Sequence, residues 1–154
     1  FQAEDGIRDF CLSRGLGDVY KRQALYMTSL YIGNYLSYRY HNKQDNYCAV
    51  GASGAVSGVV FSSVILYPEM KMMLLFLPIP LPGYVMATLY LVYTIYGMRK
   101  QKDNIGHTAH FGGAIAGIIA TIAFIPSVIN DSGFTLLILV TTLVIAAILF
   151  IKYN

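Results

Sequence analysis

The sequence predicts an all-α fold, a polytopic bundle of about four to five transmembrane helices. The first observation is composition: 56% of the 154 residues are apolar, 12% are charged, and the mean hydropathy is +0.54. Soluble domains carry about a quarter charged residues and just under half apolar ones, so this balance disfavours a soluble enzyme. The second observation is that long apolar stretches alternate with polar or proline-containing connections. The expected environment is therefore a lipid bilayer.

Charge and cysteine usage argue against several other classes of protein. The formal net charge is only +3, and the chain has no basic run or alternation of basic and aromatic residues, so nucleic acid is not an expected partner. Cys11 and Cys48 lie far apart, without a C-x-x-C pair or a Cys/His ligand spacing. This spacing indicates neither a disulfide framework nor a zinc site. We expect no metal and no organic cofactor.

The first 23 residues differ from the rest of the chain. They hold 8 of the 19 charged residues, and they contain neither a starting Met nor the short apolar region of a signal peptide. Residues 2–9 (QAEDGIRD) and 13–23 (SRGLGDVYKRQ) resemble the in-frame translation of two common DNA-sequencing adapters. We therefore expect residues 1–23 to be non-native, with the native protein entering at Ala24 in mid-gene and its true N-terminus missing. The alternative is a polar cytoplasmic tail.

The apolar stretches define the expected helices. A helix needs roughly 17–25 mainly apolar residues to cross the hydrocarbon core, because no water is available there to satisfy its backbone. Four or five stretches are candidate spans: 24–40, 51–67, 84–98, 106–125 and 134–151. The connections between them, interpreted as loops or re-entrant turns, are 41–47, 68–83, 99–104 and 126–133. Tyrosines within the third span are expected in interfacial belts and bundle packing.

Proline and basic residues add detail to this topology. In LPIPLPG, residues 77–83, the prolines remove backbone donors and fix φ, so this stretch cannot continue a helix. We expect it at the membrane interface, or alternatively as a kinked entry to the next span. If all five segments span, one side of the membrane carries six basic residues against Lys71 on the other: Arg39, Lys43, Arg99, Lys100, Lys102 and Lys152. The positive-inside rule then places the 41–50 and 99–105 connections in the cytoplasm.

Polar, reactive side chains begin two helices that are otherwise apolar. They lie in GASGAVSG, residues 51–58, and in GHTAHFGGAIAG, residues 106–117, each after a polar connection on the same side of the membrane. Ionisable residues at membrane depth are costly and by default mark a functional site. Glycines on one face of each segment allow close helix packing, which would bring Ser53 and His110 together. These glycines are Gly51, Gly54, Gly58, Gly113 and Gly117.

A serine and a histidine in this arrangement predict nucleophilic catalysis. A serine hydroxyl needs a base to remove its proton, and an imidazole within hydrogen-bond reach is the usual base. Ser53 is therefore the candidate nucleophile and His110 the candidate base, with His107 ranked second. The backbone N–H groups of Ser53 and Ala52, near a helix N-terminus, are candidates for stabilising an oxyanion. Each feature also has a purely structural explanation, because glycine pairs, back-bonding serines and interfacial histidines are common in membrane helices.

The runs VGASGAVSG at residues 50–58 and AHFGGAIAG at residues 109–117, with LPIPLPG between them, resemble a rhomboid intramembrane serine protease of bacterial type. The resemblance covers residues 24–125. It implies that Ser53 is the nucleophile opening the fourth helix of a six-helix core, and that His110 is the base opening the sixth. It further implies transmembrane proteins as substrates and a multi-pass location in the bacterial inner membrane. Residues 126–154 would then be a loop and an additional C-terminal transmembrane helix.

The sequence departs from the family pattern at several points. Rhomboids carry H-x-x-x-N on their second helix to help hold the oxyanion, whereas Asn34 here is preceded four residues earlier by Leu30. The first two helices are therefore expected to be missing. Many relatives have an aromatic residue one turn after the serine, where this chain has Ser57, so we expect the base to be positioned from elsewhere, for example by Phe61. Family topology also opens the site to the outside, against the basic-residue count, and we follow the family.

The leading functional hypothesis is therefore a serine endopeptidase that cleaves transmembrane segments through a Ser53–His110 dyad. We expect this fragment itself to be inactive, because the missing helices would supply oxyanion donors. The alternative is a catalytically inactive rhomboid-like protein that binds transmembrane helices, although an intact Ser/His pair argues against it. A soluble hydrolase elbow, G-x-S-x-G, does not fit, because glycine follows Ser53 immediately.

Overall fold

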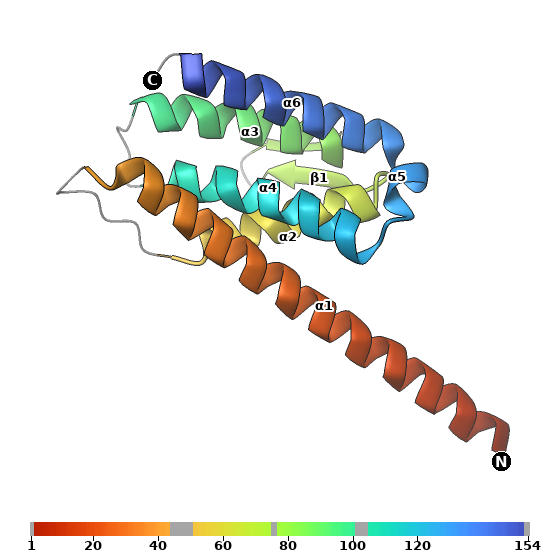
Figure 1. Ribbon diagram of the computed structural model, residues 1–154. Coiled ribbons are helices and arrows are strands. Elements are labelled where there is room, and N and C mark those ends of the chain that lie inside the picture. Colours follow the sequence, from red (N-terminus) through yellow and green to blue (C-terminus); the bar gives the residue numbers. More distant parts are fainter. Residues whose placement is uncertain (1, 44–50, 75–76, 101–104, 153–154) are drawn as a thin grey trace.

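The computed structural model describes residues 2–43, 51–74, 77–100 and 105–152. Its elements confirm the predicted all-α helical bundle, with one short β-hairpin added (Figure 1). The helices are α1 (Gln2–His41), α2 (Ser53–Leu66), α3 (Gly83–Lys100), α4 (His107–Phe124), α5 (Val128–Asp131) and α6 (Gly133–Lys152). The strands are β1 (Lys71–Leu74) and β2 (Leu77–Pro82). Residues 44–50 and 101–104, which belong to two predicted connections and include Cys48 and Lys102, lie outside the described residues.

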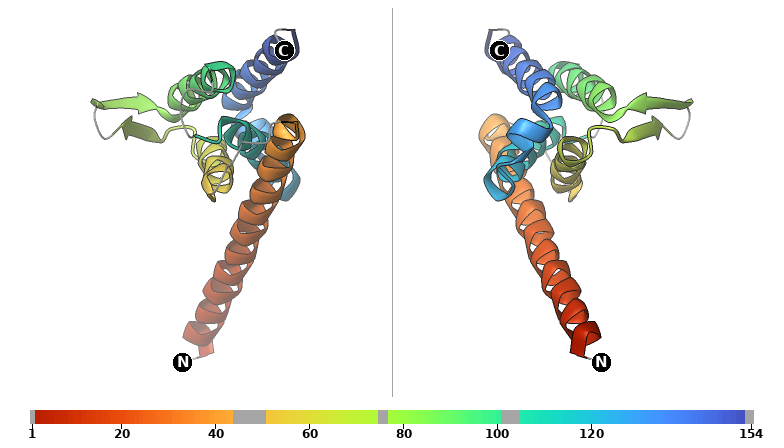
Figure 2. Two further views of the ribbon diagram at one scale, coloured as in Figure 1. Left: turned by 90° about the vertical axis from the view of Figure 1, so that its left-hand side faces the viewer. Right: turned by 90° about the vertical axis from the view of Figure 1, so that its right-hand side faces the viewer.

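Helix α1 is longer than the predicted span. The stretch 24–40 was expected as a helix, and the structure continues the same helix back to Gln2 through the polar segment 1–23. The N-terminal half of α1 projects beyond the other helices (Figures 1 and 2). Residues 19–24 are exposed, and the side chain of Leu25, next along the helix, is buried. From residue 19 onward, the packed part of α1 thus begins at Leu25.

Helix α4 is the centre of the bundle and packs against α1, α2 and α3. Its glycines make this possible. A Cβ atom added to Gly113 would overlap the carbonyl oxygen of Gly54, and one added to Gly117 would overlap that of Gly58. The two helix backbones therefore touch along the predicted glycine faces, which is the close approach that small residues allow between membrane helices.

The remaining side of the bundle is formed by α3 and α6. Large apolar side chains from α2, α3 and α6, including Phe61, Ile65, Leu91 and Leu139, are fully buried in one core. The guanidinium of Arg99 on α3 donates a hydrogen bond to the carbonyl oxygen of Leu149 on α6, at 3.1 Å. The short helix α5 occupies part of the 126–133 connection, which was expected to be a loop.

The 68–83 connection was expected as a loop or re-entrant turn, and the structure corrects this expectation to an antiparallel hairpin. The hairpin projects sideways from the helices (Figure 2). Met72 pairs with Leu81 and Lys71 with Pro82, and the Gly83 N–H donates to the Met70 carbonyl oxygen at 2.8 Å. Successive N–H groups of a strand point in opposite directions, so prolines at every second position interrupt only the outward-facing donors. The same pattern that excludes a helix is therefore compatible with an edge strand.

By length and composition, one helix of the described residues could cross a membrane: α4, over His107–Phe124. Helix α2, Ser53–Leu66, is apolar but has only 14 residues, and α6 is apolar over Gly133–Leu149. This is fewer than the four or five spans expected from the sequence, because α2 has only 14 residues and α3 ends in the basic pair Arg99 and Lys100.

Candidate active site

Ser53 is the first residue of α2, and the backbone before it turns sharply. Gly51 has φ 142°, a conformation that residues with a Cβ rarely adopt, and Ala52 caps the helix without a side-chain hydrogen bond. The Ala52 carbonyl oxygen accepts the first helical hydrogen bond, from the N–H of Val56 at 3.1 Å. Within the described part of the chain, the N–H groups of Ala52 and Ser53 have no hydrogen-bond acceptor. The start of α2 therefore presents an exposed serine beside two backbone donors that no described residue accepts from.

His110 lies in the first turn of α4, and its backbone N–H donates to the carbonyl oxygen of Gly106 at 3.0 Å. Its ring nitrogen Nε2 is buried and has no hydrogen-bond partner among the residues that the structure describes. Gly113, one turn later on α4, is the residue held against Gly54 on α2. The glycine contact therefore fixes the position of His110 along the helix axis relative to the start of α2.

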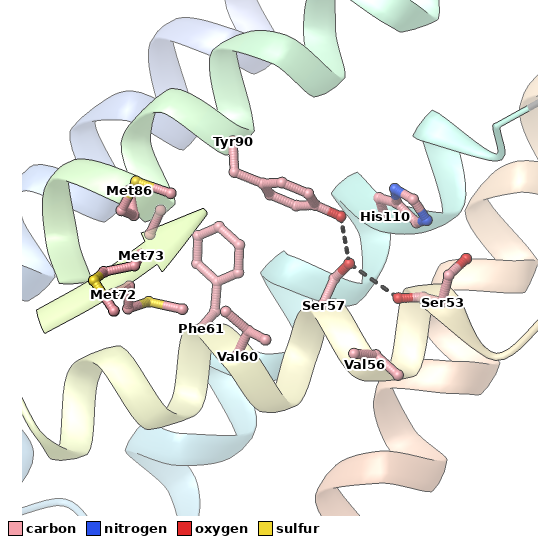
Figure 3. A pocket seen from close by; sticks show the side chains of 11 residues that line it. Ser53, Val56, Ser57, Val60, Phe61, Met72, Met73, Met86, Tyr90 and His110 are labelled. Carbon is pink, nitrogen blue, oxygen red and sulfur yellow. Dashed lines mark hydrogen bonds between the residues drawn. The ribbon is translucent and has the colours of Figure 1, made fainter. Parts of the chain in front are cut away.

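Ser53 and His110 line the same pocket, which has a volume of about 380 Å³. They lie at one end of it, and Met72, Met73 and Met86 lie at the other (Figure 3). The walls between are mainly apolar side chains of α2 and α3. No hydrogen bond joins Ser53 to His110 in this structure, in which both residues are described. The two side chains thus share a cavity without being directly hydrogen-bonded.

Ser57 and Tyr90 occupy the space beside the two candidate residues. The Ser57 hydroxyl donates to the Ser53 carbonyl oxygen at 3.0 Å and lies 2.7 Å from the Tyr90 hydroxyl (Figure 3). The ring of Tyr90 stacks on that of His110, with centroids 6.0 Å apart and an interplanar angle of 25°. Tyr90 was expected only in an interfacial belt or in bundle packing, and no sequence signal links it to a histidine 20 residues later on another helix.

Phe61 was expected as a residue that could position the base. It is fully buried in the wall of the pocket, and its ring lies 6.1 Å from that of Tyr90. The ring that stacks on His110 is therefore that of Tyr90, and Phe61 packs against Tyr90. The reason is geometric, because Phe61 is two turns beyond Ser53 along α2.

His107, the second-ranked base, faces a different part of the bundle. Its side chain is buried, its ring makes an edge contact with Tyr93 at 5.3 Å, and it fills the space beside Gly97. It also lies 6.2 Å from the ring of His110, but it is not among the residues that line the pocket. His41 of α1 and Thr108 make a 3.1 Å hydrogen bond at the same end of the bundle. This end of α4 is therefore packed from two sides, with His110 facing the pocket.

One end of an apolar pocket is thus lined by an imidazole and by a serine at a helix start, side chains of the kinds that acyl transfer uses. Comparison with known families gives one match: a family model described as the Rhomboid domain covers residues 15–127. The chain belongs to the rhomboid family. It is accordingly an integral membrane protein, although the curated proteins and the solved structures that were compared gave no match. In this rhomboid the matched region contains both Ser53 and His110, and it begins within the polar segment 1–23.

Proposed function

We propose that this rhomboid is an intramembrane serine endopeptidase that cleaves transmembrane segments of other membrane proteins. The observation that carries the proposal is the shared pocket, in which the hydroxyl of Ser53 and the unpartnered Nε2 of His110 lie at the same end. The apolar remainder of the pocket suits a peptide whose side chains come from a lipid environment. We place the whole gene product in the bacterial inner membrane as a multi-pass protein.

In the proposed reaction, the Ser53 oxygen attacks the scissile carbonyl carbon while His110 accepts the hydroxyl proton. The tetrahedral oxyanion accepts hydrogen bonds from the backbone N–H groups of Ser53 and Ala52, which have no other acceptor in the described residues. The C–N bond then breaks, and His110 delivers its proton to the leaving amine. A water molecule, deprotonated by His110, hydrolyses the acyl-enzyme and restores the Ser53 hydroxyl. The step needs no metal or organic cofactor.

The Ser53 side chain must move for this reaction to proceed. Ser53 and His110 are not hydrogen-bonded in the structure, and catalytic hydrogen bonds are often long in unliganded enzymes and tighten when substrate binds. Ser53 is exposed at the helix start, so rotation of its χ1 angle changes the position of the hydroxyl without moving the backbone. In the proposed reaction, rotation of the Ser53 side chain within the shared pocket closes the dyad.

The test is Ser53→Ala in the product of the whole gene, reconstituted in liposomes with a labelled transmembrane substrate. Cleavage should be lost while expression and thermal midpoint are unchanged. Ser63→Ala is the matched control, because Ser63 lies on the same helix and its hydroxyl only bonds back to the Val59 carbonyl oxygen at 2.9 Å. Full cleavage by Ser53→Ala would eliminate the dyad.

The alternative is a rhomboid that binds transmembrane helices without cutting them, and the missing Ser53–His110 hydrogen bond is the observation in its favour. A fluorophosphonate probe separates the two functions, because it reacts covalently with an activated serine. Labelling of the native protein that disappears in Ser53→Ala supports the protease. A protein that binds a transmembrane peptide but takes up no label is the non-cleaving form.

A further inference from the structure

One ring of its own helix lies near the imidazole of His110: that of His107, one turn earlier, in an edge arrangement with centroids 6.2 Å apart. The other neighbours one turn away, Gly106, Gly113 and Ala114, carry no side chain large enough to hold a ring. Neither ring nitrogen makes a hydrogen bond to any described residue. The near-parallel ring contact that can orient the imidazole comes instead from a neighbouring helix, α3.

Tyr90 of α3 supplies the contact. Its ring lies nearly parallel to the imidazole, at 25°, with a centroid separation of 6.0 Å. Aromatic pairs in such arrangements attract each other beyond the effect of the area that they bury. The phenol ring is therefore a flat surface against which the imidazole is oriented.

Ser57 fixes the position of Tyr90 in turn. The single hydroxyl proton of Ser57 is donated to the Ser53 carbonyl oxygen, so in the 2.7 Å contact the Tyr90 hydroxyl donates and the Ser57 oxygen accepts. Ser57 is buried, with 5% of its surface exposed, and it lies one turn after Ser53 on α2. Two hydrogen bonds and one ring stack thus connect the backbone of Ser53 to the imidazole of His110 (Figure 3).

We propose that Tyr90 and Ser57 are a positioning pair that sets the geometry between Ser53 and His110. Ser57 holds the phenol at the start of α2, and the phenol orients the imidazole of α4. Through this pair, α3 contacts both the turn of α2 that carries Ser53 and the turn of α4 that carries His110. The inference rests on the proposed function, since it assigns these two residues a role in the same reaction.

Two kinds of variant test the pair. Tyr90→Leu removes the ring and the hydroxyl, and Tyr90→Phe removes only the hydroxyl. Ser57→Ala removes the acceptor of the same hydrogen bond. Because Tyr90→Phe and Ser57→Ala break one shared bond, each should lower kcat by about two- to tenfold, and the double variant should be no slower than the slower single variant. Tyr90→Leu should lower kcat by about a hundredfold, the scale of a misplaced catalytic group.

The measurement is kcat and KM for a transmembrane substrate in liposomes, using the whole gene product, with the thermal midpoint of each variant. A positioning role lowers kcat by a larger factor than it raises KM, although both residues line the pocket. Tyr96→Leu is the matched control, because Tyr96 is on the same helix but is exposed, with its ring 4.8 Å from the ammonium of Lys100. Tyr96→Leu should retain the native kcat.

The outcomes separate the two proposals. Native cleavage by Ser53→Ala overturns the proposed function and the positioning pair with it. Loss of cleavage in Ser53→Ala together with native kcat in Tyr90→Leu overturns the pair alone. If Tyr90→Leu does not fold, the hydroxyl variants decide: equal, non-additive losses support the pair, and native rates or fully additive losses overturn it.

Discussion

Gly113 of α4 lies so close to Gly54 of α2 that a Cβ atom added to Gly113 would overlap the Gly54 carbonyl oxygen. The obstacle is backbone, so neither helix can relieve the overlap by rotating a side chain. His110 is one turn before Gly113, and Ser53 is next to Gly54. The contact that allows the bundle to close therefore also sets the separation of the two candidate catalytic residues.

Gly113→Ala should accordingly weaken both the fold and the proposed activity. Overfilling a well-packed contact costs typically about 1–3 kcal/mol, and relief requires α4 to move away from α2. We expect a lower thermal midpoint in detergent and slower substrate cleavage. Gly133→Ala is the control, because nothing lies within 4 Å of the added Cβ. Equal thermal midpoints for Gly113→Ala and Gly133→Ala would show that α4 can move away from α2 without loss of stability.

The two histidines should differ in their effect on cleavage. His110 faces the pocket with its Nε2 unpartnered in the described residues, whereas His107 packs against Tyr93 and Gly97 outside the pocket lining. His110→Ala should lower kcat by at least about a hundredfold, the smaller end of the range for general acid–base catalysis. His107→Ala should lower the thermal midpoint more than kcat, because it empties a buried site. The reverse ranking in kcat would assign the base to His107.

Much of the fold follows from composition and spacing. The stretch 106–125 becomes α4 over His107–Phe124, and the rhomboid resemblance carried by the serine and histidine motifs is confirmed by the family match. These features are local, since an apolar run and a glycine repeat determine a membrane helix and its packing face. The roles of Ser53 and His110 in catalysis stay predictions.

The features that the sequence does not reveal depend on contacts between distant segments. The contact between Tyr90 and His110 joins α3 to α4 and depends on how these helices are rotated about their axes. A tyrosine in an apolar stretch has the same local signature whether it faces lipid or a pocket. The hairpin at β1 and β2 was missed because its prolines were interpreted only as helix breakers, and the strand pairing depends on their alternation.

Ser132 should anchor the far end of α2. Its buried hydroxyl donates to the carbonyl oxygen of Ile65 at 2.6 Å, and this carbonyl belongs to the last turn of the helix, where no intrahelical donor remains. Ser132→Ala should lower the free energy of unfolding by about 1–3 kcal/mol, because the acceptor stays buried without its donor. The measurement is chemical or thermal unfolding in detergent.

Thr141→Ala is the control for this prediction. The Thr141 hydroxyl is also hydrogen-bonded to a carbonyl oxygen, that of Leu137 at 2.7 Å, but it is exposed and the bond lies within one helix. Its loss should change the unfolding free energy by much less. A Ser132 variant that is no less stable than the Thr141 variant would remove the anchoring role.

Gly51 should be required for a different reason from Gly113. Among the described residues, the nearest non-neighbouring atom to a Cβ added at Gly51 is the Ser53 nitrogen at 4.0 Å, so space is available, but φ is 142° and residues with a Cβ are strained there. Such strain costs about 1–3 kcal/mol. Gly51→Ala should relieve it by moving Ala52 and Ser53, which carry the candidate oxyanion donors. We therefore expect the rate of fluorophosphonate labelling at Ser53 to fall more than the thermal midpoint does. If labelling stays at the native rate while the midpoint drops, the turn at Gly51 supports only the fold, and the oxyanion donors must be sought elsewhere in the protein.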